Sequence, residues 1–496
     1  MQNYIARLRR DIGVGSERST RLKANALNFF DNTVIGVAST APAYSLAASL
    51  GGIVAVVGFM SPALLLWNFV PMIGIACAFY YLNKYVGPSA GGVYSWVSTS
   101  LNRYLGYMSG WAIAAAGILF LISGSVPAGT YTLALINPDL SDNPVLVSLV
   151  SAAWFIVVTF IVVRGIEITA KFQWVLLLIE YVVLLVFAGV ALYRVYGVGV
   201  PGSTPIHWSW FTFHGSLADF ASATTIALFF YWGFDTITNL GEESKDARNN
   251  PGWAGVTSVI ALLIIFLVVS ISVQALIPEE EIVKHQDDIL SYFAGLLAPH
   301  PWSDLMILSV LSSTVATLET TLLPSARVSY EMAVDRVLPE VFGKVHPSWK
   351  TPHIGTLIIA AISFIGIFSI NLSSSVGSFL ENAASNVGIM VAYYYGISGV
   401  TSAWFLRKRL TDWRILVFGF VLPLLSGLYL VAVGIIVLLE SGFSSSLPAL
   451  VAFALGLPVM AYYAFKNRAW FRSPEVPALS EDVLVGGAKV DQSGDL

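Results

Sequence analysis

The stretch ATTIALFFYWGFDTITNLGEES, residues 223–244, is an apolar run that is interrupted in its middle by Gly233 and Asp235. A carboxylate inside a membrane costs about 3 kcal/mol or more, so Asp235 is expected to face a cavity or a partner rather than lipid. Glycine weakens a helix at the same place. The stretch therefore predicts a membrane helix that is broken near the middle of the bilayer.

A second interruption lies five predicted spans earlier, in FFDNTVIGVASTAPAYSLAASLGG, residues 29–52. Pro42 lacks a backbone donor and disturbs the preceding turn, and the hydroxyl groups of Ser39 and Thr40 can satisfy the backbone groups that it frees. A simple proline kink and an unwound stretch whose backbone binds a substrate both explain this pattern. Because interruptions paired between two halves of a chain are typical of transporters, the pair indicates a binding site at the midplane.

The composition indicates that nearly the whole chain is one membrane domain. Of its 496 residues, 56% are hydrophobic and 11% are charged, whereas about 25% of residues are charged in soluble proteins. Apolar runs long enough to cross a hydrocarbon core of about 30 Å recur along the chain, so we expect an all-α membrane fold with about 12 transmembrane helices. The predicted spans are residues 28–52, 60–83, 104–133, 143–163, 170–193, 216–240, 253–277, 302–327, 354–371, 377–404, 413–438 and 446–465.

The distribution of basic residues predicts the orientation of these spans. Of the 26 Lys and Arg residues, all except Arg194 and Lys284 lie in segments that share one side of the membrane with both termini. An excess of positive charge marks the cytoplasmic side, so both termini are expected there. The polar tails, residues 1–26 and 467–496, are expected to be poorly ordered. The Gly-, Pro- and Ser-rich segment 84–103 is expected to be a cytoplasmic amphipathic or re-entrant connection.

Three carboxylates lie within apolar runs: Asp235, Glu180 in residues 174–187, and Glu319 in residues 312–324. No Lys or Arg lies deep in any predicted span to neutralise them. A lone carboxylate is costly to desolvate, so each is expected to be protonated or to lie beside a bound cation, unless hydroxyl groups and water hold it as a structural element. The first two cases predict proton coupling, with Glu180 and Glu319 as candidate coupling residues, or a cationic substrate.

Aromatic side chains precede the break in the sixth span at Phe229, Tyr231 and Trp232. The face of an aromatic ring attracts an ammonium group, although ordinary packing explains such residues equally well. Together with Gly233 and Asp235 they form one half of the predicted substrate site.

A charged loop, GEESKDARNNPG, follows the break at residues 241–252. It is expected either to form ion pairs that close a cytoplasmic gate or to be an ordinary solvated loop. Arg327, after the eighth span, allows the same two interpretations. The candidate gate residues in the loop are Glu242, Glu243, Lys245 and Arg248.

Signatures of catalysis and of cofactor binding are absent from the sequence. It has no phosphate-binding loop, HExxH motif, metal-ligand cluster or nucleophile elbow, and its single cysteine, Cys77, rules out an intrachain disulfide. We therefore expect neither an enzyme nor an ATP-driven pump, and no cofactor, metal or nucleic-acid partner. The expected partners are a small-molecule substrate and membrane lipid, while a monomer and a homodimer both stay open.

Three motifs, in the same order along the chain, resemble those of the amino acid–polyamine–organocation (APC) superfamily, over roughly residues 20–440. LFFYWGFDTITNLGEESKDARNNPGWA (228–254) is similar to the family's broken sixth helix, PSAGGVYSWV (88–97) to its re-entrant segment, and SARVSYEMAVDRVLP (325–339) to the end of its eighth helix. The start of the first span, residues 34–51, resembles bacterial permeases for cationic amino acids or putrescine.

The resemblance implies a LeuT-type fold, in which two inverted repeats of five helices surround the substrate and helices 1 and 6 unwind beside it. The transporter domain would cover residues 27–466, with repeats at about 27–195 and 214–405 and two further helices at 412–466. The resemblance also implies a multi-pass protein of the bacterial cytoplasmic membrane.

Several residues depart from the family pattern at the substrate site that the resemblance implies. Ala38, Ser39 and Thr40 fall where many amino acid transporters have Gly-Ser-Gly, whose amides bind the substrate carboxylate, and neither glycine is present. Phe229 falls where relatives place an aromatic gate, and Asp235 falls where some relatives have an Asn that contacts the substrate.

The candidate coupling residues also depart from the family pattern. Glu180 falls at a position where several relatives carry a Lys linked to proton coupling, and Glu319 falls at a position where relatives often carry an Asn. These departures add negative charge or remove an anion site, so we expect a basic amino acid, a diamine or polyamine, or an alkylamine as substrate. The favoured function is proton-coupled import by alternating access, with sodium coupling less favoured. An uncoupled exchanger, a neutral amino acid permease and an amine sensor on the same fold stay open as alternatives.

Overall fold

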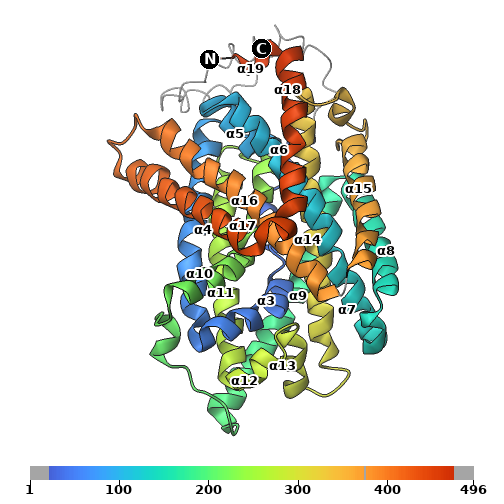
Figure 1. The fold of residues 1–496 in the computed structure, drawn as a ribbon, viewed down its shortest axis with the longest axis vertical. Coiled ribbons are helices and arrows are strands. Elements are labelled where there is room, and N and C mark those ends of the chain that lie inside the picture. Colours follow the sequence, from blue (N-terminus) through green and yellow to red (C-terminus); the bar gives the residue numbers. More distant parts are fainter. Residues whose placement is uncertain (1–21, 374–375, 474–496) are drawn as a thin grey trace.

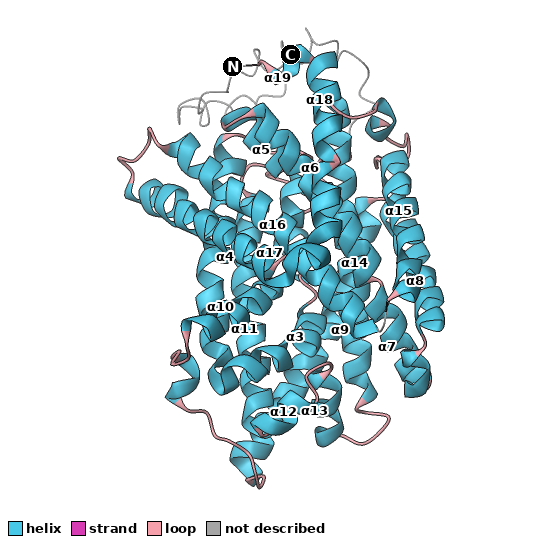
Figure 2. Cartoon of the chain, in the orientation of Figure 1, coloured by secondary structure: helices cyan, strands magenta, loops and turns pink. Residues whose placement is uncertain are grey.

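The structure, a computed structural model, describes residues 22–373 and 376–473, which form a bundle of helices (Figures 1 and 2). The helices of the first half are α2 (Phe29–Ala38), α3 (Pro42–Val57), α4 (Ser61–Tyr85), α5 (Val93–Ser100), α6 (Arg103–Gly124), α7 (Val126–Ile136), α8 (Pro144–Arg164) and α9 (Ile166–Tyr193). Those of the second half are α10 (Leu217–Leu228), α11 (Asn250–Leu276), α12 (Glu279–Lys284), α13 (Ile289–Leu297), α14 (Asp304–Val334), α15 (His353–Ile367), α16 (Val376–Leu406), α17 (Leu422–Ala454), α18 (Gly456–Lys466) and α19 (Arg468–Phe471).

Ten stretches of the described residues are long and apolar enough to cross a membrane. One of them, Phe29–Tyr85, contains α2, α3 and α4 and so covers the first two predicted spans. The predicted sixth span is not among the ten, because it is divided between α10 and two short 3-10 segments. The all-helical membrane fold is confirmed, while the count of 12 spans and the inverted repeat stay predictions.

The two ends of the bundle carry the short helices. In Figure 1, α12 and α13 lie at the opposite end from α5 and α19. The short helix α5 lies within the predicted re-entrant segment 84–103 and packs inward, with Tyr94 and Trp96 buried. The orientation itself, with the loop that carries α12 and α13 on the outer side, stays a prediction.

α14 is the most deeply buried long helix of the fold. Every residue from 309 to 333 is buried, although this stretch carries many hydroxyl-bearing and charged side chains. Hydroxyl groups such as those of Thr314 and Ser325 donate to carbonyls of the preceding turn, 2.8 and 3.0 Å away, and so are satisfied without water. By contrast, α9 exposes apolar side chains such as Val175 and Leu178, as expected for a helix in contact with lipid.

The first span is broken as predicted. α2 and α3 are separated by Ser39, Thr40 and Ala41, and Ala41 has φ 47°, a left-handed conformation that is uncommon for residues other than glycine. Pro42 begins α3, where its missing N–H costs nothing because the first amides of a helix have no partner within the helix. The interruption is therefore a true break between two half-helices and not only a proline kink.

The sixth span is broken at the same level of the bundle. α10 is followed by a 3-10 turn at Phe229–Tyr231, by Gly233 at φ 118°, and by a 3-10 segment at Phe234–Glu243. A Cβ atom added to Gly233 would overlap the carbonyl oxygen of Ser39. The two breaks are therefore in direct backbone contact, and the residues 39–41 and 229–233 are called the central break below.

Other predicted spans are bent. α6 and α7 meet at Ser125, and together they form the third predicted span. α17 has a kink at Gly442, where φ is 74°, and it gives way to α18 at Leu455. The last two predicted spans are thus joined through a kinked helix and not through a loop.

The residues of both predicted tails that lie next to the helical bundle make specific contacts with it. The N–H of Ala26 donates to the carbonyl of Glu243 at 2.7 Å, and Trp470 of α19 stacks on Tyr94 with ring centroids 6.0 Å apart. These residues are held by backbone pairing and aromatic packing, which the polarity of the neighbouring sequence does not reveal. The other residues that were expected to be poorly ordered, 1–21 and 474–496, lie outside the described part of the chain.

Replacing Gly233 with Ala is expected to lower the free energy of unfolding by about 2 kcal/mol or more, because a strained backbone conformation costs about 1–3 kcal/mol and the new Cβ collides with the Ser39 carbonyl. Thermal unfolding of the purified protein in detergent, followed by tryptophan fluorescence, measures the loss. Gly189→Ala in α9 is the matched control, because a Cβ there meets no atom within 4 Å. Equal losses in both variants would contradict the close contact between the breaks.

Candidate functional site

Four helix ends meet at the central break. The carbonyl ends of α2 and of the α10 segment point toward it, while α3 and the 3-10 segment Phe234–Glu243 begin there. Helix C-termini carry partial negative charge and N-termini partial positive charge. The break therefore offers carbonyl oxygens that suit a cation and amides that suit an anion.

The amide end of α3 is already occupied by a carboxylate of the protein. Oε1 of Glu180, from α9, accepts hydrogen bonds from the N–H of Ala43 at 2.6 Å and from the hydroxyl of Ser313, on α14, at 2.9 Å. The side chain of Glu180 is fully buried, and its Oε2 has no hydrogen-bond partner among the described residues. Glu180 thus caps α3 and joins three helices beside the break.

Asp235 is held from α16. Its Oδ1 accepts a hydrogen bond from the hydroxyl of Tyr395 at 2.7 Å, and the side chain is buried. The indole N–H of Trp232 donates to the hydroxyl of the neighbouring Tyr394 at 2.8 Å. Sequence reasoning missed both tyrosines, although the run YYYG at 393–396 was a usable signal, because a buried tyrosine hydroxyl needs a polar partner.

The hydroxyl groups of the first break are satisfied locally. Ser39 donates to the carbonyl of Ile35 at 2.6 Å, and Thr40 donates to the carbonyl of Val37 at 2.8 Å. The carbonyl of Ala38 accepts from Thr317 of α14 at 2.9 Å. These contacts hold the end of α2 in place, so the groups that face the break are mainly backbone atoms.

The aromatic residues predicted for the site lie in different directions. The ring of Trp232 packs edge-on against Phe120 of α6, with ring centroids 5.1 Å apart. The hydroxyl of Tyr231 donates to the carbonyl of Leu65 in α4 at 3.0 Å, so this residue contacts α4. The backbone of Phe229 begins the 3-10 turn, while its side chain lies outside the described part of the structure.

Two cavities adjoin α16, and the smaller one borders the break. One of about 40 Å³ is almost wholly apolar and includes Trp232 and Tyr395 in its wall. A larger one of about 460 Å³ lies between α6, α16 and α17, and its polar wall residues are Ser123, Ser369, Asn386 and Ser445. The break therefore adjoins space bordered by aromatic rings, which attract cations.

Glu319 lies apart from the other two buried acids. Its carboxylate accepts a hydrogen bond from the amide of Gln173 on α9, and the same amide donates to the carbonyl of Ala316 at 2.9 Å. Glu180, Asp235 and Glu319 therefore each have their own partner and do not form a single cluster. Among the described residues, no group of three or more His, Cys, Asp or Glu side chains is arranged to hold a metal ion.

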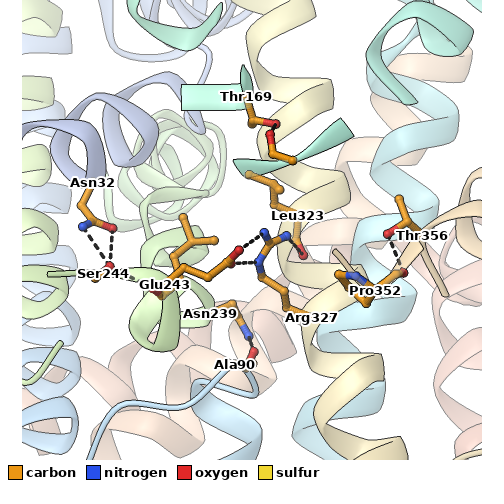
Figure 3. A network of polar contacts seen from close by, with 12 residues as sticks. Asn32, Ala90, Thr169, Asn239, Glu243, Ser244, Leu323, Arg327, Pro352 and Thr356 are labelled. Carbon is orange, nitrogen blue, oxygen red and sulfur yellow. Dashed lines mark hydrogen bonds and ion pairs between the residues drawn. The ribbon is translucent and has the colours of Figure 1, made fainter. Parts of the chain in front are cut away.

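A buried ion pair joins the end of the sixth span to α14 (Figure 3). Arg327 of α14 binds both carboxylate oxygens of Glu243, with Nε–Oε2 at 2.5 Å and Nη2–Oε1 at 3.0 Å, and each side chain is only 1% exposed. Two parallel hydrogen bonds of this kind fix the orientation of both groups. Beside the pair, Asn32 of α2 and Ser244 hydrogen-bond through their side chains at 3.0 Å.

The other candidate gate residues occupy different positions. Lys245 is exposed, and Arg248 donates from Nη1 to the carbonyl of Lys84 at 3.0 Å. Within the described part of the chain, neither Lys245 nor Arg248 takes part in an ion pair, whereas Glu242, next to the buried Glu243, is half-buried. The 3-10 segment turns Glu243 toward α14, while the loop after it brings Arg248 to α4 and pairs the backbone of Lys245 with Leu27.

Comparison with known proteins gives a match over most of the chain. A family model described as amino acid permease matches residues 27–458. The low-affinity putrescine importer of Escherichia coli (strain K12) is 27% identical over 336 residues, which are 65% of this chain and 69% of the importer. The methylthioribose transporter of Bacillus subtilis (strain 168) is 24% identical over 366 residues, 71% of this chain and 76% of that protein.

A third relative, the branched-chain amino acid permease of Bacillus subtilis (strain 168), is 24% identical over 294 residues, 56% of this chain and 60% of that permease. The three names mention different transported compounds, so sequence similarity alone does not identify the compound that this chain transports.

Replacing Arg327 with Met is expected to lower the free energy of unfolding by about 3–5 kcal/mol, because it leaves the buried charge of Glu243 without a partner. The double variant Glu243→Gln/Arg327→Met should recover much of that loss. Chemical unfolding in detergent measures both.

Lys23→Met provides the control for this pair. Lys23 and Glu167 lie 2.7 Å apart, but their side chains are 47% and 50% exposed, and exposed pairs contribute at most about 1 kcal/mol. A double variant as unstable as Arg327→Met would show that the uncompensated charge is not the cause.

Proposed function

The chain belongs to the amino acid permease family, and on that premise we propose that it is a secondary transporter of a cationic organic amine or basic amino acid. Its family and relatives are permeases and transporters, not enzymes. We place it in the bacterial cytoplasmic membrane with both termini in the cytoplasm, and we propose import driven by the proton gradient.

The observation that carries the substrate proposal is the position of Glu180. Its carboxylate accepts the N–H of Ala43 at 2.6 Å, at the amide end of α3. A helix N-terminus at a transporter midplane is a natural place for the carboxylate of an amino acid substrate. In this chain a substrate carboxylate would compete with a glutamate that is already in place, which favours a substrate whose recognition depends on its amine.

The charges around the break support a cationic substrate. Glu180 and Asp235 are both buried next to it, while Arg327, on the inner side, is paired with Glu243. Carboxylates of like sign in a low-dielectric interior are costly unless a cation or a proton offsets them. We infer that an ammonium group of the substrate binds near Asp235, beside the rings of Trp232 and Tyr395.

The carboxylate of Glu180 also offers a way to couple transport to protons. A hydrogen bond from Ala43 to an ionised Glu180 is charge-assisted and becomes weaker when Glu180 takes up a proton. Protonation would therefore loosen the contact between α3 and α9, and loss of the proton would restore it. Glu319, bonded to Gln173, is the second candidate for the coupling proton.

The pair Glu243–Arg327 is proposed as the cytoplasmic gate. The carbonyl of Glu243 accepts the N–H groups of Ala26 and Leu27, and the N–H of Lys245 donates to the carbonyl of Leu27 at 2.7 Å. These bonds tie the inner halves of the first and sixth spans together. Both halves would therefore leave α14 as one unit when the ion pair separates and the substrate is released inward.

The substrate proposal predicts which compounds stabilise the purified protein. Putrescine, agmatine and simple alkylamines should raise the melting temperature in a concentration-dependent way, because a ligand that binds only the folded state stabilises it. Asp235→Asn should abolish this shift, and Asp139→Asn, in the exposed outer loop, should leave it unchanged. Stabilisation by neutral amino acids alone would favour a neutral amino acid permease and contradict the proposal.

The coupling proposal predicts a separation of two transport modes in Glu180→Gln. The amide oxygen can still accept the N–H of Ala43, so counterflow of labelled amine in proteoliposomes should persist, while accumulation driven by a pH gradient should fall by about tenfold or more. Glu319→Gln is tested in parallel. Loss of accumulation only in Glu319→Gln would move the proton site there, and full accumulation in both variants, without dependence on pH, would favour an uncoupled exchanger.

A further inference from the structure

Three basic side chains gather at the cytoplasmic end of α4. The ammonium group of Lys84 and the guanidinium group of Arg409 both lie over the ring of Tyr85, 5.6 and 4.9 Å from its centroid. Arg248 joins them through its hydrogen bond to the carbonyl of Lys84 at 3.0 Å. Lys84, Arg248 and Arg409 come from α4, from the loop after the sixth span and from the α16–α17 connection, and they are called the basic cluster below.

Carboxylates of the described residues do not neutralise the cluster. Within the described residues, none of its three members forms an ion pair with Asp or Glu. The acids carried by the same two loops hydrogen-bond to neutral groups of their own loops: Asp246 accepts from the side chain of Asn249 at 3.0 Å, and Asp412, which lies near Tyr81, accepts from the N–H of Arg414 at 2.9 Å. Like charges held together in this way favour a multivalent anion as a ligand.

More positive charge surrounds the cluster on the connection between α16 and α17. Arg407, Lys408 and Arg414 are exposed there. The guanidinium group of Arg407 lies 3.7 Å from the ring centroid of Trp404, and that of Arg414 lies 5.8 Å from that of Trp413. Tryptophan and arginine side by side are typical of the zone where lipid headgroups meet the hydrocarbon core.

An exposed apolar face continues from this basic surface along the last spans. Figure 1 shows the connection between α16 and α17, in orange, at the margin of the bundle. The face includes Trp413 (62% exposed) and Leu425 (61% exposed), with these residues between and beyond them: Leu416, Val417, Phe418, Val421 and Leu428. On the other side of the cluster, Trp253 is exposed and packs on Tyr80, with ring centroids 4.9 Å apart.

We propose that the basic cluster binds the headgroup of an anionic phospholipid of the cytoplasmic leaflet. The phosphate would lie among Lys84, Arg248 and Arg409, and the acyl chains would lie along the apolar face of the η10–α17 segment, Ile415–Ala454. A soluble phosphate or another polyanion would gain nothing from that apolar face, whereas an amphiphile uses both parts. Basic pockets between membrane helices on this side bind such headgroups in other proteins.

A lipid bound there would join elements that are distant in sequence. It would bridge the inner end of α4, the loop that follows the sixth span and the α16–α17 connection. The proposal does not depend on which substrate the protein transports, and it predicts that anionic lipid stabilises the fold whether or not an amine is present.

The test compares the full-length protein in nanodiscs of phosphatidylcholine alone and in nanodiscs that also contain phosphatidylglycerol. Phosphatidylglycerol is expected to raise the melting temperature of the wild type, because it binds the folded state. Lys84→Gln/Arg409→Gln should weaken the apparent affinity for phosphatidylglycerol by roughly 30-fold, since each basic residue near the surface contributes about one factor of five.

Lys171→Gln/Lys344→Gln removes the same charge from exposed positions on the same predicted side and should keep the wild-type response. An equal response in the cluster variant and the wild type would overturn the proposal. It would also be overturned if inorganic phosphate in solution stabilised the protein as strongly as phosphatidylglycerol, because the site would then bind a free anion and not a lipid.

Discussion

The contact between the carbonyl of Ser39 and Gly233 is the constraint on which the rest of the site depends. Two helices end and two begin at this point, in a bilayer interior that supplies no water to unpaired backbone groups. The protein provides the partners itself. The hydroxyl groups of Ser39 and Thr40 donate to carbonyls of their own helix, and Glu180 accepts the N–H of Ala43. A side chain at position 233 would push the breaks apart and disturb these bonds.

The central helix α14 connects the break to the inner side of the protein. Ser313 donates to Glu180, Thr317 donates to the last carbonyl of α2, and Arg327 pairs with Glu243. Three side chains along one buried helix thus hold α9, α2 and the end of the sixth span. A movement of the two broken spans away from α14 must disrupt several of these contacts together, which favours two discrete arrangements over a gradual change.

Negative and positive side chains lie in different parts of the molecule, and each group suits a different partner. Negative charge lies inside, at Glu180 and Asp235 beside the break, and within the described part of the chain neither carboxylate is hydrogen-bonded to a basic side chain. Positive charge without an ion-pair partner among the described residues lies at the end of α4, in the basic cluster, whose Lys84 and Arg409 lie over Tyr85. The first arrangement suits a cation that enters the protein, and the second suits the anionic surface of the membrane. Between them, the pair Glu243–Arg327 is neutral as a unit and so can be buried.

The membrane fold, the approximate positions of the spans, both breaks and the buried acids could be predicted without a structure, because apolar runs, Gly233, Pro42 and isolated carboxylates act through their immediate neighbours in the chain. Only the tertiary structure decided which groups those acids meet. Glu180 and Ala43 are 137 residues apart, Tyr395 and Asp235 are 160 apart, and Glu243 and Arg327 are 84 apart. No local pattern encodes such pairs, since each depends on how helices pack and on which way a short 3-10 segment turns. For that reason the charged loop after the sixth span was expected to hold the ion pairs, whereas Glu243 pairs with Arg327 on α14.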